Sequence, residues 1–200
     1  MLNDQQLAAL TKLFAHGSTD ASAALSRWLG RPAQIKISRI EEVALATAAE
    51  VLGDPELPVC FCAMSLQGAL TGELILAMND ASGQALADLL LSRPLGTSRT
   101  WGEVEISAAL ETANIIGCAY LNALAQMLPD GTELLPTPPR FARDFAESLM
   151  EFALMNQAAV SDTVFLTQTE FQIAESPVDC HLLLVPDPES VTVLQGLLAK

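Results

Sequence analysis

The sequence predicts an α+β fold in which one order of elements, helix-strand-helix-strand-strand-helix, occurs twice. Helical and strand periodicities follow each other in this order in both halves, which lie at about residues 1–98 and 99–200. Residues 73–91 also align without a gap on residues 181–199, with leucines and a serine in common. The alternative to a true repeat is a chance match between two leucine-rich segments. Since a chain of 200 residues, 50% of them hydrophobic, can form one substantial core, we expect a single domain over residues 1–200.

The elements of the first half follow from hydrophobic spacing and from the residues that end helices and strands. Gly30 and Pro32 end the opening helix, and residues 17–20 are a potential interruption within it. The expected elements are a helix over residues 4–29, a strand over 34–38, a helix over 41–51, strands over 57–67 and 70–78, and a helix over 82–91.

The second half opens with the best-marked helix of the chain. Thr100 and Glu103 match the T-x-x-E capping box at its start, and Pro129, Asp130 and Gly131 mark its end. The elements expected after it are a short extended stretch over residues 133–135, a helix over 141–155, strands over 162–172 and 178–185, and a final helix.

Charge and hydropathy exclude several classes of protein. Twenty-four acidic and ten basic residues give a net charge of -14, which repels nucleic acids and anionic membrane surfaces. No stretch approaches the roughly 20 apolar residues of a membrane span, and the first residues lack the basic start of a signal peptide. We therefore expect a cytoplasmic protein that binds neither nucleic acid nor membrane.

Cysteine and histidine spacing predicts neither a disulfide framework nor a metal site in this chain. The two histidines have no H-x-x-x-H or C-x-x-C companion, and buried thiols in a reducing compartment explain the unevenly spaced cysteines Cys60, Cys62, Cys118 and Cys180. The chain has no catalytic triad, nucleophile elbow or phosphate-binding glycine loop. A small-molecule enzyme with an internal pocket therefore has little support.

The long helix of the second half carries a narrow polar stripe. Ser107, Glu111 and Asn114 stand at i, i+4 and i+7, so their side chains share one face. A wide apolar face suited to burial is formed by Ile106, Leu110, Ala113, Ile116, Tyr120 and Leu124. We therefore expect the polar stripe to point outward, where a partner can reach it.

The stripe suits chemistry that is shared with a partner. A carboxamide holds donors and an acceptor, so Asn114 can orient a water molecule for in-line attack on phosphorus without acting as a base. A carboxylate one turn away, that of Glu111, can pair with a lysine of the partner and hold the amide in register.

These residues resemble the signature of the response-regulator phosphatases of the CheC, CheX and FliY type, S/D-x-x-x-E-x-x-N followed by 22 residues and a proline. Ser107, Glu111 and Asn114 match the pattern, and the order of elements is most similar to CheC. The resemblance implies two pseudo-symmetric halves around a shared sheet. It also implies that Glu111 docks on a lysine of a receiver domain, that Asn114 positions the hydrolytic water, and that Ser107 supports the helix face.

The same resemblance implies the partner and the cofactor. The substrate would be the aspartyl-phosphate of a CheY-like response regulator in two-component chemotaxis signalling. Magnesium would belong to that receiver domain, with no cofactor or metal in this chain. A CheD-like regulator is a further candidate partner.

Two departures from the family pattern leave a second interpretation open. Thr137 occupies the position of the family's proline, with prolines on both sides of it. The opening helix has no E-x-x-N. If the halves are aligned with a shift of 99 residues, Lys12 and Ala15 correspond to Glu111 and Asn114, and with a shift of 108 residues Asn3 and Gln6 correspond to them. One degenerate site suits a phosphatase with half its sites, but it also suits a non-catalytic scaffold with the related fold of the motor-switch protein FliM.

Overall fold

The computed structural model describes residues 2–52, 54, 56–149, 163–173 and 176–199. Its helices are α1 (Asp4–Leu29), α2 (Leu45–Val51), α3 (Asp80–Leu90), α4 (Glu103–Ala125) and α6 (Pro188–Leu197). Its strands are β1 (Ala33–Ala44), β2 (Pro58–Gly68), β3 (Gly72–Asn79), β4 (Leu134–Pro136), β5 (Arg140–Phe145), β6 (Thr163–Ile173), β7 (Ser176–Val178) and β8 (His181–Pro186). The predicted α+β class is confirmed.

One antiparallel sheet joins the two halves of the chain. Its order is β1-β6-β8-β3-β2-β4, with β5 also on β2 and β7 on β6. The order is symmetric about its centre when each strand is matched with its counterpart in the other half. In this match β1 corresponds to β4 and β5, β6 corresponds to β2, and β8 corresponds to β3. Ile75 pairs with Leu183 at the centre. Because these two residues are equivalent in the gapless alignment of residues 73–91 with 181–199, their pair lies on the pseudo-two-fold axis.

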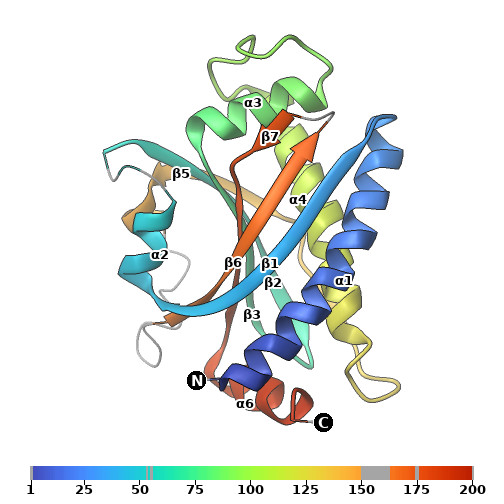
Figure 1. Cartoon of the computed structure of the whole chain (residues 1–200). Coiled ribbons are helices and arrows are strands. Elements are labelled where there is room, and N and C mark those ends of the chain that lie inside the picture. Colours follow the sequence, from blue (N-terminus) through green and yellow to red (C-terminus); the bar gives the residue numbers. More distant parts are fainter. Residues whose placement is uncertain (1, 53, 55, 150–162, 174–175, 200) are drawn as a thin grey trace.

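The curved sheet has a hydrophobic core on each face. Figure 1 shows α1 and α4 side by side on one face and α2 on the other. Alternation along β2 sends Cys60, Cys62 and Met64 toward the helix pair, and sends Val59 and Phe61 toward α2. Cys60, Cys62 and Cys180 are buried free thiols, as predicted, and Cys118 is half-buried.

Helices α1 and α4 pack closely at a glycine. A Cβ atom on Gly17 would lie 2.9 Å from the Tyr120 ring and 3.3 Å from the Ala123 Cβ. The adjacent Phe14 ring has its centroid 5.0 Å from that of Tyr120. The predicted opening helix is therefore continuous, and Gly17 serves close packing rather than an interruption.

Side chains of α1 cover the outer edge of β1. The Ser22 and Ser26 hydroxyls accept hydrogen bonds from the backbone N–H groups of Ile35 and Ala33, at 2.8 and 2.9 Å. Further along the strand, Ile40 N–H donates to the Thr11 hydroxyl at 3.1 Å. These bonds satisfy edge groups that an unpaired strand would expose, so α1 is held along β1 as well as against α4.

Residues 41–44 are strand, although their spacing predicts helix. They extend β1 beyond a bulge at Ser38 and pair with residues 163–166 of β6. The helix α2 begins only at Leu45. Pairing with a distant strand outweighs the local helix preference of this glutamate- and alanine-rich segment.

The predicted helix over residues 141–155 is wrong in its first five residues, which belong to β5. Phe141 pairs with Cys62 on β2, and its ring packs 4.8 Å, centroid to centroid, from that of Trp101. Residues 146–149 are helical, and the remainder of the predicted helix lies outside the described residues.

The predicted capping box before α4 is also wrong. The N-cap is Gly102, without a side-chain cap, so Thr100 lies outside the helix and Glu103 is its first residue. The helix ends at Ala125, before the predicted Pro129. Among the described residues, no helix combines the length and the apolar character that a membrane crossing needs.

The loop that leads from α3 to α4 is fixed by a buried carboxylate. Asp88 accepts hydrogen bonds from the backbone N–H groups of Thr97 at 2.9 Å and Ser98 at 2.8 Å. Although burial alone would raise the pKa of Asp88, these amide donors hold it below its usual value.

We expect Asp88→Asn to lower the free energy of unfolding at pH 7 by about 1–3 kcal/mol, because one amide then loses its acceptor. The folded pKa of Asp88 is lowered, so its contribution is present above the unfolded pKa of about 4 and is lost on acidification through the folded value. Urea unfolding between pH 2 and 7 should therefore show a smaller loss of stability for the variant on acidification. Asp130→Asn, in an exposed turn, is the control; equal pH profiles for all three proteins would contradict this account.

We expect Gly17→Leu to destabilise the fold by about 1–3 kcal/mol, because the larger side chain overpacks the contact between α1 and α4. Gly196→Leu is the matched control, since a Cβ at this helical position meets nothing within 4 Å. Thermal unfolding of both variants measures the difference. A Gly17→Leu protein as stable as Gly196→Leu would show that the helices do not need the glycine.

Candidate functional site

The polar stripe of α4 faces outward, as its spacing predicts. Ser107 and Glu111 are exposed, and Asn114 is half-buried. The opposite face is anchored in the core by four of the six residues predicted for it, Ala113, Ile116, Tyr120 and Leu124, while Ile106 and Leu110 are half-buried.

Gly117 brings the centre of α4 close to the sheet. A Cβ atom at this position would lie 2.4 Å from the Sδ atom of Met64, a residue of β2. Backbone and sheet are thus separated by little more than one side chain. This contact seats the turn of α4 between Asn114 and Gly117 directly on the sheet, so Asn114 is carried on a rigid element rather than on a loop.

Asn114 lies at the wall of a groove between α1 and α4. The groove has a volume of about 460 Å³ and is lined from α1 by Asp20, Ala23, Ala24 and Arg27, and from α4 by Asn114, Ile115, Cys118, Ala119 and Asn122. Small side chains on both walls leave the groove open. A partner's side chain or loop can therefore reach the Asn114 amide.

Glu111 and Asn114 are available for a partner. The side chains of Ser107 and Glu111 have no hydrogen bond or ion pair to another described residue, beyond the backbone bonds of α4 itself. The Asn114 amide oxygen has one long contact, 3.7 Å from the Cys118 thiol. Burial, and secondarily the Glu111 charge, raises the pKa of Cys118, so this thiol stays protonated and is a weak donor rather than a nucleophile.

The first helix presents no equivalent pair. Lys12 is exposed and Ala15 is half-buried, so in the register of a 99-residue shift α1 offers neither a carboxylate nor an amide there. In the register of a 108-residue shift the equivalent residues are Asn3 and Gln6, which bond to each other as the capping box of α1 and include no carboxylate. What α1 does contribute to the groove is Arg27, a residue that the motif analysis did not single out. Only the packing of α1 against α4 brings it there.

Thr137 has a structural role in place of the family's proline. Its N–H donates to the Ser65 carbonyl at 2.9 Å, and its hydroxyl accepts from the Ser65 N–H at 3.0 Å. A proline could form neither bond, because it has no N–H and no hydroxyl. Thr137 thus continues the pairing of β4 with β2.

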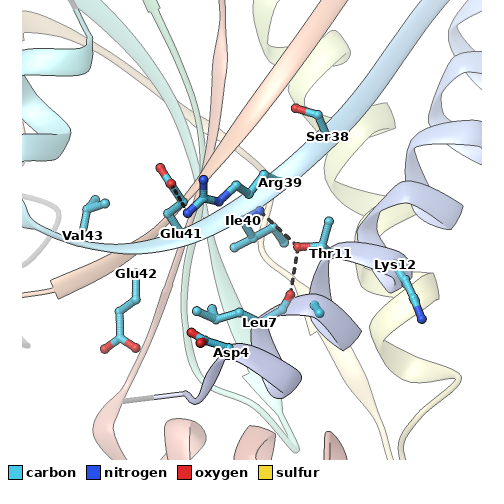
Figure 2. Close-up of a pocket in the computed structure, with 11 residues that line it drawn as sticks. Asp4, Leu7, Thr11, Lys12, Ser38, Arg39, Ile40, Glu41, Glu42 and Val43 are labelled. Atoms are coloured by element: carbon cyan, nitrogen blue, oxygen red, sulfur yellow. Dashed lines mark hydrogen bonds and ion pairs between the residues drawn. The ribbon is translucent and has the colours of Figure 1, made fainter.

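A second groove lies between the first half of α1 and β1, with a volume of about 660 Å³. Figure 2 shows its charged side chains spread along both walls. Arg39 is paired with Glu41 at 2.7 Å, and Thr11 is engaged by the Ile40 backbone. No nucleophile and base converge here, so this groove has no recognisable catalytic arrangement.

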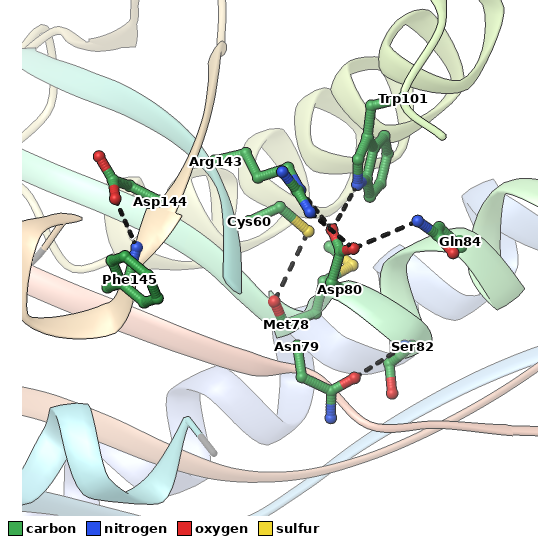
Figure 3. A network of polar contacts seen from close by, with 10 residues as sticks. All are labelled: Cys60, Met78, Asn79, Asp80, Ser82, Gln84, Trp101, Arg143, Asp144 and Phe145. Atoms are coloured by element: carbon green, nitrogen blue, oxygen red, sulfur yellow. Dashed lines mark hydrogen bonds and ion pairs between the residues drawn. The ribbon is translucent and has the colours of Figure 1, made fainter. Parts of the chain in front are cut away.

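A polar network surrounds Asp80 at the start of α3 (Figure 3). Its carboxylate accepts hydrogen bonds from the Trp101 indole at 2.7 Å and from the Arg143 guanidinium at 2.7 and 3.0 Å. These donors lower the pKa of Asp80 despite its partial burial, which acts in the opposite direction. Burial also raises the pKa of the adjacent Cys60 thiol, so the network ties α3 to β5 without an activated nucleophile.

The described part of the chain contains no group of three or more histidine, cysteine, aspartate or glutamate side chains that could hold a metal ion. The groove between α1 and α4 presents the Asn114 amide and the Arg27 guanidinium, and the Glu111 carboxylate stands one turn from Asn114 on α4.

No protein-family model matches the chain. Among solved structures, Thermotoga maritima FliY is similar with a TM-score of 0.78 and 16% identity, over 100% of this chain and 98% of that chain. The middle domain of Helicobacter pylori FliM gives 0.72 and 13%, over 98% and 99%. A chain of the CheX–CheY–BeF3–Mg²⁺ complex from Borrelia burgdorferi gives 0.51 and 15%, over 88% and 96%.

Identities this low show the fold and not the activity. The matches with FliY and FliM extend over nearly the whole of both chains, so the likeness includes both halves and the sheet between them. The chain therefore has the fold of the CheC/CheX/FliY family, which the middle domain of FliM shares.

Proposed function

We propose that this protein is a phosphatase of receiver-domain response regulators in chemotaxis signalling. The observation that carries the proposal is the outward placement of Glu111 and Asn114, one turn apart on α4 and beside an open groove. The similar CheX chain comes from a structure with CheY, BeF3 and Mg²⁺. A CheY-like receiver that carries its own Mg²⁺ is accordingly the partner we propose for this chain.

In the proposed reaction, Asn114 enters the receiver's active site and its amide oxygen accepts a hydrogen bond from a water molecule. The water oxygen then forms a bond to phosphorus, in line with the phosphorus–oxygen bond to the aspartyl group. That bond breaks with its electron pair on the aspartate carboxylate, and the water's proton passes to a phosphoryl oxygen, so the products are aspartate and inorganic phosphate. The amide acts by position and not as a base. Glu111 pairs with a lysine of the receiver and sets the depth and register of the insertion.

Ser107 has a supporting role in this proposal. It is exposed one turn before Glu111 and extends the polar surface against which the receiver would pack. A CheD-like regulator remains a further proposed partner, which co-purification with this chain would test.

A scaffold function is the second candidate. FliM middle domains are structurally similar to this chain, and one of them, from Helicobacter pylori, comes from a FliG–FliM complex, with a TM-score of 0.69 and 100% of both chains covered. The absence of an E-x-x-N pair on α1 favours this candidate. A scaffold would bind its partner without hastening the loss of phosphate.

We expect Asn114→Ala to lower the rate of receiver dephosphorylation on the order of 10²-fold while binding persists, because the water loses its positioning group. The assay follows phosphate release from receiver domains of the same organism, each phosphorylated with acetyl phosphate. Asn122→Ala is the control, since this exposed asparagine lies two turns further along the same groove and should leave the rate nearly unchanged. Hydrolysis that is insensitive to Asn114→Ala would favour the scaffold.

We expect Glu111→Lys to weaken binding of the phosphorylated receiver about tenfold or more, because two cations then face each other across the interface. Titration calorimetry with the BeF3-activated receiver measures the affinity. Glu50→Lys, on α2 at the opposite face of the sheet, controls for the change in net charge. Equal affinities for wild type and Glu111→Lys would remove the docking role of Glu111.

A further inference from the structure

The groove beside Asn114 contains a cation that comes from the other half of the chain. Arg27 is in the last turn of α1 and is exposed. Among the residues that line the groove, it is the single positively charged one, and Asp20 lies at the other end of the α1 wall. The α1 wall of the groove is therefore negative at the Asp20 end and positive at the Arg27 end.

The antiparallel packing of the helices places Arg27 at the functional end of the groove. Gly17 contacts Tyr120, so these two residues lie at the same level along the helix pair. Arg27 is ten residues beyond Gly17, and Asn114 is six residues before Tyr120. At roughly 1.5 Å per residue, Arg27 lies about 6 Å beyond Asn114 along the helix pair, near the level of Glu111.

Arg27 is not neutralised within the chain. In the part of the protein that the structure describes, its guanidinium has no hydrogen bond and no ion pair, and the carboxylate of Glu111 is equally unpaired. Four other arginines have carboxylate partners, namely Arg39, Arg93, Arg140 and Arg143. Arg31 and Arg99 also have no ion pair to the described residues, but neither lines this groove. The charge of Arg27 is thus directed at solvent, beside the two residues proposed to engage a partner.

The overall charge makes this cation significant. A protein with a net charge of -14 repels a phosphoryl group, and a local positive charge reduces this repulsion where such a group would approach. An arginine presents a planar fork of donors that matches two oxygens of a phosphoryl group or carboxylate.

We infer that Arg27 binds an oxyanion of the phosphorylated receiver while Asn114 and Glu111 engage its active site. This inference rests on the proposed function. It makes α1, which lacks the signature, a contributor to the single site on α4. Arg27 acts here as a positioning residue that anchors the partner beside Asn114.

A local structural role is the competing explanation, since a basic residue in the last turn of a helix stabilises the helix dipole. The two roles differ in what they change. A dipole partner affects the melting temperature, whereas an oxyanion anchor affects the affinity for the partner and its dependence on salt.

The test compares Arg27→Gln, Arg27→Lys and Lys12→Gln in the full chain. Lys12 is an exposed cation on the same helix but lies outside this groove. We expect Arg27→Gln to raise the KM for the phosphorylated receiver about tenfold and to flatten its salt dependence, with kcat and melting temperature little changed. Arg27→Lys should recover part of the loss, and Lys12→Gln should match wild type.

Binding to receivers with and without the phosphoryl group identifies the oxyanion. A loss confined to the phosphorylated form assigns Arg27 to phosphoryl oxygens, and an equal loss for both forms assigns it to a receiver carboxylate.

Unchanged KM, affinity and salt dependence in Arg27→Gln would overturn the inference, as would a lowered melting temperature with unchanged affinity. If Asn114→Ala is inactive while Arg27→Gln behaves as wild type, only the inference about Arg27 fails. If wild type binds receivers without hydrolysing them, the phosphatase proposal fails and the affinity of Arg27→Gln still tests the role of Arg27.

Discussion

The close packing of α1 against α4 is the contact on which the candidate site depends. At Gly17 the absence of a side chain lets the helices approach until the backbone of α1 meets the Tyr120 ring. Beside this contact the two helices line a groove with alanines on both walls. Accessibility of the Asn114 amide thus depends on how α1 packs against α4, and the serine and threonine bonds from α1 to β1 help to hold α1 in place.

The two halves have kept their topology and lost their chemical equivalence. The sheet order reads the same when the halves are exchanged, and Ile75 and Leu183 meet at its centre. Yet α4 presents Glu111 and Asn114 at its surface, while α1 offers Lys12 and Ala15 in one register. Backbone pairing and core packing need only apolar side chains at the right period, so they tolerate this divergence. Surface residues are free to specialise, because little of the fold depends on them.

The edge strands show the same divergence. β1 is continuous through a bulge at Ser38, whereas its counterpart is divided into β4 and β5 around Thr137, Pro138 and Pro139. Both edges bend at equivalent places, by an extra residue in one half and by prolines in the other. Sequence spacing alone predicts helix on the far side of both bends, at residues 41–44 and 141–145. Both segments are strands because β6 and β2 offer them backbone partners far away in sequence.

The sequence by itself determined the α+β class, the repeated order of elements, the buried face of α4 and the outward direction of Ser107, Glu111 and Asn114. These features depend on local period and on the identity of side chains, which a single chain displays directly. Tertiary structure decided where each edge strand ends, how Thr137 is used, and which residues of α1 stand beside Asn114. Arg27 is separated from Asn114 by most of the first half, and no local pattern links them. Their proximity arises from antiparallel packing about the contact of Gly17 with Tyr120, and only the folded chain contains that contact.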